Sequence, residues 1–182
     1  MKDIEMQLAM QCAPLIAGLK ISNLLIIPYQ EEREVIELLQ KTEISCYRLL
    51  VSMDKVTLIL FRQNELEAFI GGADVEKCLE NMGYTEYSLD RILCTFRTRY
   101  REYMTHGGKF PHEMGLLLGY PVEDVEGFIE NEGKNCLYSG YWKVYHNLSE
   151  KKKLFERFRL AREMMMDMIS KGVKIADIMT AI

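Results

Sequence analysis

The stretch YRLLVSMDKVTLILFR, residues 47–62, decides the fold class of this 182-residue chain. It contains two runs rich in apolar and β-branched residues, 47–53 and 56–62, with Asp54-Lys55 between them. Two such runs joined by two polar residues are typical of a β-hairpin with a tight turn. An earlier apolar run, LLII at residues 24–27, has the length of a buried strand. We therefore expect a small, mainly antiparallel sheet in the N-terminal third, with helices covering at least one face.

Helical patterns surround the predicted strands. The first helix is expected over residues 3–12 and should end near Pro14, because a proline biases the preceding residue away from helical geometry. From Asn64 onward the chain has mostly helical patterns. We expect no domain boundary, since no linker rich in Pro, Gly and Ser and no internal repeat is present. The prediction is one domain, residues 1–182, with an α+β fold in which the sheet packs with helices and the C-terminal part is helical. The other predicted helices cover 31–41, 88–104, about 121–131, a long segment from 149, and 173–179, with Asn64 and Ser88 as N-caps.

Composition narrows the functional class. The chain is 48% hydrophobic and 27% charged, as ordinary globular proteins are. Its net charge of -4 argues against a nucleic-acid partner, because phosphate binding needs a clustered excess of Lys and Arg. We expect no membrane span, since no window reaches the roughly 18 apolar residues that one requires. The N-terminal MKDIE lacks the net positive charge of an export signal, and the five cysteines include no C-x-x-C pair. These features predict free thiols and a cytoplasmic location.

The densest functional lead is the stretch from Phe110 to His146, which begins FPHEMGLLLGYP. His112 is the best single candidate for acid–base or ligand chemistry, because the pKa of histidine is about 6.5 when unperturbed. Glu113 beside it could act as a base, although neighbouring helical residues point about 100° apart. Leu116 stands where a zinc protease motif would place its second histidine. The alternative is structural: His112 caps the next helix or bonds a backbone carbonyl, and Glu113 stabilises the N-terminus of that helix.

Other side chains of the chain allow both a binding and a structural interpretation. Arg97 and Arg101 share one face of the predicted helix 88–104 and could clamp an anion, or simply form a solvated face. Tyr141 and Trp142, next to Lys143, could line a pocket for a planar ligand or pack in the core.

Cys12 is the most suggestive thiol because it lies near a predicted helix end. A reactive thiol needs a lowered pKa, which a helix N-terminus or a cation provides and a helix C-terminus does not. A buried, inert cysteine is therefore the alternative. A metal site would have to combine distant histidines and cysteines, because the chain has no local pair of ligands. We expect no metal, and the residues indicate no particular cofactor.

Three motifs carry a resemblance to a known family. They are CAP at 12–14, FPHEMGLLLGYP at 110–121 and GYWKVY at 140–145. The chain resembles an uncharacterised bacterial family, found mainly in anaerobes and catalogued as a domain of unknown function. The resemblance covers almost the whole chain and implies no activity. It marks as signature positions Cys12, Lys20, Pro111, His112, Glu113, Gly119, Tyr120, Pro121, Asp124, Gly127, Phe128, Gly140, Tyr141 and Trp142.

Two functional hypotheses follow. The first is a noncatalytic binding or accessory module that meets a small molecule or a protein partner at residues 110–146. Its candidate ligand-binding residues are Lys20, Tyr120, Tyr141, Trp142 and Lys143. The rival is an enzyme or redox protein with Cys12 as nucleophile or ligand, His112 as acid or base and Glu113 as orienter or second base. The rival requires these three side chains to converge in one pocket.

Overall fold

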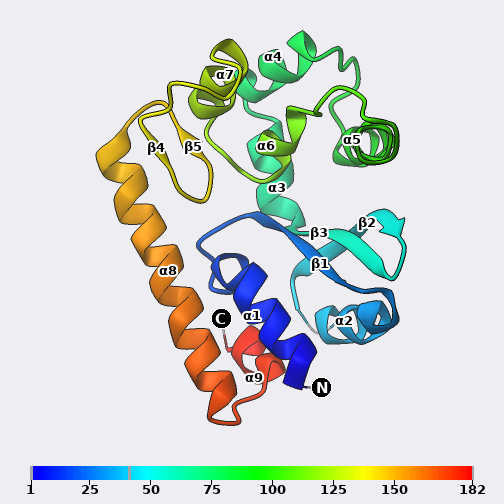
Figure 1. Ribbon diagram of the computed structural model, residues 1–182, viewed down its shortest axis with the longest axis vertical. Coiled ribbons are helices and arrows are strands. Elements are labelled where there is room, and N and C mark those ends of the chain that lie inside the picture. Colours follow the sequence, from blue (N-terminus) through cyan, green and yellow to red (C-terminus); the bar gives the residue numbers. More distant parts are fainter. Residues whose placement is uncertain (1, 41, 182) are drawn as a thin grey trace. The chain divides into compact units, whose positions relative to one another are not determined.

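The computed structural model describes residues 2–40 and 42–181. For residues 2 and 3 it describes the backbone alone. Within these residues the chain forms nine α-helices and two antiparallel sheets (Figure 1), which confirms the predicted α+β class. The chain divides into two compact units. Unit 1 comprises Met1–Gln63 and Arg157–Ile182, and unit 2 comprises Asn64–Glu156.

The three-stranded sheet of unit 1 is built on the predicted hairpin. β2, Ile44–Ser52, and β1, Ser22–Pro28, flank β3, Lys55–Arg62, and both pairings are antiparallel. The turn is Met53-Asp54 rather than the predicted Asp54-Lys55, because Lys55 already pairs with Ser52. Met53 has a φ of 54°, in the left-handed region that the common two-residue hairpin turns use.

One face of this sheet carries the core of unit 1. Leu25 of β1 and Leu58 and Leu60 of β3 are fully buried in it. α1, Lys2–Ile16, packs on β1. The same core is completed by α2, Glu32–Leu39, by the C-terminal part of α8, Leu148–Ser170, and by α9, Ile175–Thr180. A short 3-10 turn, Tyr29–Glu31, precedes α2, and the predicted end of that helix at Lys41 lies outside the described residues.

The sequence predicts that the first helix ends near Pro14. In the structure this helix, α1, continues to Ile16. A proline inside a helix removes the bond to the carbonyl four residues earlier, here that of Met10. The helix continues because the N–H of Ala17 still bonds to the Ala13 carbonyl at 2.8 Å. The helix then closes on the Pro14 carbonyl, which accepts the N–H of Leu19 at 2.8 Å, while Gly18 adopts a φ of 67°.

A side chain of α1 occupies the free edge of β1. The Gln11 amide accepts the N–H of Ile26 at 2.9 Å and donates to the Ile26 carbonyl at 3.0 Å. Asn23 in turn donates to the Gln11 carbonyl at 2.5 Å. These bonds satisfy backbone groups that an edge strand otherwise leaves open to pairing. They also hold Cys12, the next residue of α1, against β1.

Unit 2 is mainly helical. The predicted helix 88–104 is α5, Leu89–His106, which follows Ser88 at its N-cap position. Asn64 is not an N-cap, because α3 already begins at Gln63. The short ribbon of β4 and β5 was not predicted. The remaining elements are α3, Gln63–Ile70; α4, Ala73–Asn81; α6, Glu113–Leu117; α7, Val122–Glu130; β4, Tyr138–Ser139; and β5, Lys143–Val144.

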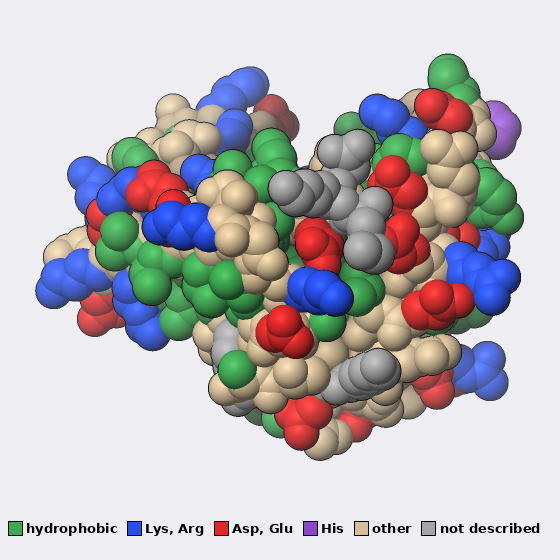
Figure 2. All heavy atoms as spheres, turned by 90° about the horizontal axis from the view of Figure 1, so that it is seen from below, with side chains coloured by type: hydrophobic (Ala, Val, Ile, Leu, Met, Phe, Trp, Pro, Cys, Tyr) green, Lys and Arg blue, Asp and Glu red, His purple; other side chains and the backbone are tan. Residues whose placement is uncertain are grey.

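Charged side chains of both signs are interspersed on the face that Figure 2 shows. None of the helices in the described part of the chain combines the length and the apolar character that crossing a membrane requires.

We propose that the two units unfold together as one domain, because α8 runs without a break through residues 156 and 157. In guanidinium chloride the fluorescence of Trp142, the single tryptophan of the chain and part of unit 2, should change at the same midpoint as the far-UV circular dichroism. Two separate midpoints would show that the units are independent domains.

Candidate functional site

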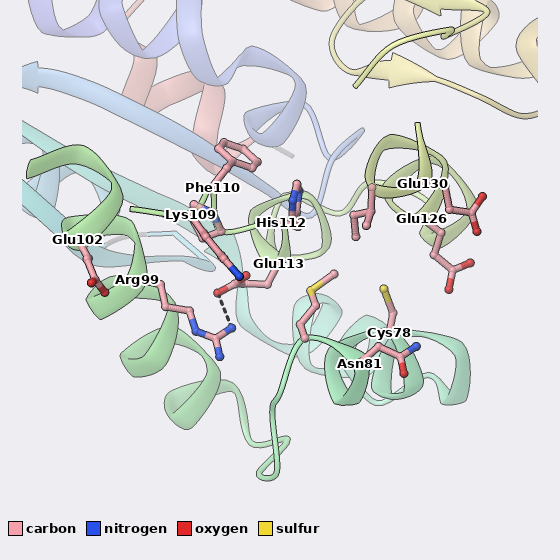
Figure 3. Close-up of a pocket in the computed structure, with 13 residues that line it drawn as sticks. Cys78, Asn81, Arg99, Glu102, Lys109, Phe110, His112, Glu113, Glu126 and Glu130 are labelled. Atoms are coloured by element: carbon pink, nitrogen blue, oxygen red, sulfur yellow. Dashed lines mark hydrogen bonds and ion pairs between the residues drawn. The ribbon is translucent and has the colours of Figure 1, made fainter. Parts of the chain in front are cut away.

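The segment 109–113, between α5 and α6, forms one wall of an open cavity of about 700 Å³ in unit 2 (Figure 3). Its other walls come from α4, α5 and α7. A cavity of this size lies within the range of roughly 300–1,000 Å³ that is typical of small-molecule sites. The lining residues are Cys78, Asn81, Met82, Arg99, Glu102, Lys109, Phe110, Pro111, His112, Glu113, Glu126, Ile129 and Glu130.

Glu113 is buried, and its carboxylate is bonded within the protein. It accepts the hydroxyl of Tyr84 at 2.9 Å and the guanidinium of Arg99 at 3.2 Å. The guanidinium also lies 4.8 Å from the centre of the Tyr84 ring. Burial and the neighbouring Glu113 raise the pKa of Tyr84 well above its usual value. The network ties the start of α6 to α5 and to the loop before α5, so Glu113 has a structural role here.

The sequence points to Glu113 but not to its two partners. Among the arginines of α5 it favours Arg97 and Arg101, whereas the structure places Arg99 on the carboxylate. Arg99 stands three residues after Phe96, which belongs to the buried stripe of α5, and this spacing could have indicated it. Tyr84 lies in a loop with no periodic pattern, so nothing in the sequence marks it.

His112 belongs to a cluster of three rings with Phe110 and Phe128, whose own ring centres are 6.2 Å apart. Its ring centre is 5.3 Å from that of Phe110 and 5.8 Å from that of Phe128. Nδ1 is buried and has no hydrogen-bond partner among the described residues. A buried N–H without an acceptor costs about 1–3 kcal/mol, whereas a bare ring nitrogen leaves no such donor unsatisfied. The proton of the neutral ring is therefore assigned to Nε2, which is not buried and serves as an open hydrogen-bond donor.

Burial also lowers the pKa of His112, and the nearby Glu113 only partly opposes this effect. Protonation would add an N–H at the buried Nδ1, so the geometry and the direction of the pKa shift agree. His112 is thus a neutral donor near pH 7.

His112 and Phe110 also border a second, smaller pocket of about 240 Å³. Three of the predicted ligand-binding residues line it. Tyr120 stacks on Trp142 with ring centres 4.8 Å apart, and burial raises the pKa of Tyr120 to about 12. Lys143 donates to the Gly133 carbonyl at 2.5 Å. The full lining is Phe110, His112, Met114, Gly115, Tyr120, Asp124, Val125, Phe128, Trp142 and Lys143.

The buried carboxylate of Asp124 holds the β4–β5 ribbon against α7. Its Oδ2 accepts the indole N–H of Trp142 at 2.8 Å. Its Oδ1 accepts the backbone N–H groups of Tyr145 at 2.8 Å and His146 at 3.0 Å. The sequence marks Asp124 as an acid near a helix N-terminus, but its partners lie 18 to 22 residues further along the chain.

Two glycines of the same stretch permit close packing. A Cβ on Gly127 would lie 2.6 Å from the Tyr145 ring, and one on Gly140 would lie 2.5 Å from the Phe155 ring. Tyr141 packs on the same Phe155 ring, with centres 5.4 Å apart. Much of the unusual composition of residues 110–146 therefore serves packing between α7, the ribbon and the start of α8.

Cys12 and Lys20, the other two predicted site residues, belong to unit 1. Cys12 has no exposed surface, and its thiol lies 3.7 Å from the carbonyl of Leu24. Burial raises the pKa of this thiol to about 12, despite the nearby Lys20. Lys20 donates to Asn23 at 3.1 Å, and burial lowers the pKa of its amine to about 8. The structure thus places Lys20 beside Cys12 in unit 1. In unit 2 His112 lines both pockets, Glu113 lines only the larger one, and Tyr141 lines neither.

Across residues 2–40 and 42–181, the structure brings together no group of three or more His, Cys, Asp or Glu side chains that could hold a metal ion.

Removal of the Asp124 carboxylate should destabilise the protein strongly. Asp124→Ala leaves three N–H donors without their acceptor, so we expect a loss of about 3 kcal/mol in the free energy of unfolding, measured in urea. Glu126→Ala, at an exposed position of the same helix, should change it by no more than about 0.5 kcal/mol. Equal losses in both variants would contradict the role given to Asp124.

His112 should make stability depend on pH. Its pKa is lower in the folded than in the unfolded chain, so the unfolded chain takes up the proton first as the pH falls. The free energy of unfolding should therefore fall more steeply below about pH 6.5 in the wild type than in His112→Phe. Urea unfolding of both proteins at several pH values measures this difference, and parallel pH profiles would contradict it.

Comparison with known proteins identifies one family. The family described as "Protein of unknown function (DUF3793)" matches residues 8–179. Comparisons with curated proteins and with solved structures found no match. The matched range takes in all three motifs on which the predicted resemblance rests, and it covers nearly the whole chain. The chain therefore belongs to the DUF3793 family of proteins of unknown function.

Proposed function

We propose that the protein is a noncatalytic binding module whose ligand is a small molecule held in the 700 Å³ cavity of unit 2. The observation that carries this proposal is the state of His112. Its ring packs against both Phe110 and Phe128 with Nδ1 buried, which leaves Nε2–H as a donor held in place by packing. Donors held in place by packing bind a ligand without the cost of ordering a mobile side chain.

Binding is favoured over catalysis because the two buried carboxylates near His112 are engaged within the protein. The Glu113 carboxylate bonds to Tyr84 and Arg99, and the Asp124 carboxylate bonds to the ribbon. The Cys78 thiol lines the cavity, but burial raises its pKa to about 11, so it remains a thiol near pH 7. His112 therefore has no activated nucleophile as a partner among these groups.

The rival enzyme requires Cys12 to act as a nucleophile. A thiol with a pKa of about 12 is almost entirely protonated near pH 7, and Cys12 has no exposed surface. Both properties are typical of an inert structural cysteine. These observations speak for the binding module.

The cellular setting is part of the same proposal. All five cysteines are free thiols, as is usual in the reducing cytoplasm. The net charge of -4 speaks for a small-molecule or protein partner and against nucleic acid.

A metabolite panel tests the proposal by thermal shift and native mass spectrometry. At least one metabolite should bind the wild type and bind His112→Phe about 3- to 10-fold more weakly, because one hydrogen bond is lost while the aromatic packing remains. Cys12→Ala should bind as the wild type does. The proposal is wrong if no metabolite binds, if His112→Phe binds equally well, or if the protein turns over a substrate in a Cys12-dependent reaction.

A further inference from the structure

Charged side chains stand on two sides of the cavity in unit 2, which bears on the kind of ligand it takes. In Figure 3 Lys109, Glu102 and the Arg99–Glu113 ion pair lie on one side, and Glu126 and Glu130 lie on the other. Lys109, Glu126 and Glu130 are exposed. None of these three has an ion pair or hydrogen bond with a described residue, so their charges are available to a ligand.

The surface between the two charged sides is largely apolar. Phe110, Met82 and Ile129 line it, together with the His112 ring. His112 lies between the charged sides in Figure 3. Its Nε2–H adds a neutral donor that suits a carboxylate oxygen. The cavity therefore offers a cation, Lys109, with the carboxylate of Glu102 at the edge of the same side, and then a neutral donor, an apolar surface and the carboxylates of Glu126 and Glu130 on the other side.

We infer that the ligand is a small zwitterion with an aromatic or apolar body, such as an aromatic amino acid. This inference rests on the proposed function and specifies the ligand class of the same cavity. The ligand carboxylate binds Lys109 and the Nε2–H of His112, and the ligand ammonium group binds Glu126 and Glu130. The body packs on the apolar surface between them.

Simpler ligands leave part of this arrangement unused. An amine without a carboxylate leaves Lys109 and the His112 donor without a partner. A carboxylate without an amine can still bind Lys109, but it leaves Glu126 and Glu130 without a positive partner and is repelled by them. Like charges brought together in this way reduce affinity.

Three compounds with the same phenylethyl body test the inference by isothermal titration calorimetry. They are phenylalanine, 2-phenylethylamine and 3-phenylpropanoate. Phenylalanine should bind at least about threefold more tightly than either of the others, because it alone engages both charged sides. The proposal is overturned if the amine or the carboxylate binds as tightly as phenylalanine, or if none of the three binds.

Charge-removing variants identify which side contacts which group. Lys109→Gln should weaken phenylalanine and 3-phenylpropanoate but not 2-phenylethylamine. The double variant Glu126→Gln, Glu130→Gln should weaken phenylalanine and 2-phenylethylamine but not 3-phenylpropanoate. Matched controls are Lys134→Gln and Glu132→Gln, exposed positions of the same unit outside the cavity lining, and neither should alter binding. Equal effects on all three compounds would contradict the proposed orientation.

The same data separate the two proposals. If none of the three compounds binds but another metabolite binds in a His112-dependent manner, the zwitterion inference is wrong and the binding module stands. If no compound of either set binds the wild type, both proposals are wrong.

Discussion

The candidate site depends on one buried carboxylate, that of Asp124, which accepts three N–H groups from the segment 142–146. A ribbon whose strands have two residues each cannot hold itself together in water. Asp124 supplies the missing constraint, because its bond to the Trp142 indole joins the ribbon to α7. Trp142 in turn stacks on Tyr120. α7 also carries Phe128, whose ring packs on His112. α7 thus joins the two parts of the site, with Asp124 bonded to the ribbon and Phe128 packed on His112.

The sheet was predictable from the sequence because its signals are local. Alternating and continuous apolar runs at 24–27, 47–53 and 56–62 indicate strands, and a two-residue gap indicates a hairpin. The predicted end of α1 near Pro14 was wrong because a proline removes only one helical hydrogen bond, and the N–H groups of Ala17 and Leu19 still bond to the carbonyls of Ala13 and Pro14. The ribbon at 138–144 was missed because strands of two residues have no period, and their stability comes from Asp124, far away in the sequence.

The candidate site was predictable only in outline. The concentration of His, Glu, Gly and aromatic residues at 110–146 pointed to closely specified geometry. In the structure some residues of this stretch serve close packing, such as Gly127 and Gly140. Others line the two pockets that His112 borders. The rest of the site depends on contacts between residues that are far apart in the sequence. Tyr84 and Arg99 engage Glu113 from 29 and 14 residues away, which no local pattern indicates. The functional role of His112 stays a prediction.

The proposed binding function depends most directly on which ring nitrogen of His112 carries the proton. Long-range ¹H–¹⁵N correlation spectra of the imidazole distinguish the two neutral tautomers and the charged ring. For the free protein at pH 7 the account predicts a neutral ring with the proton on Nε2, and a shifted Nε2–H resonance once the cavity is occupied. A proton on Nδ1, or a charged ring at this pH, would contradict it.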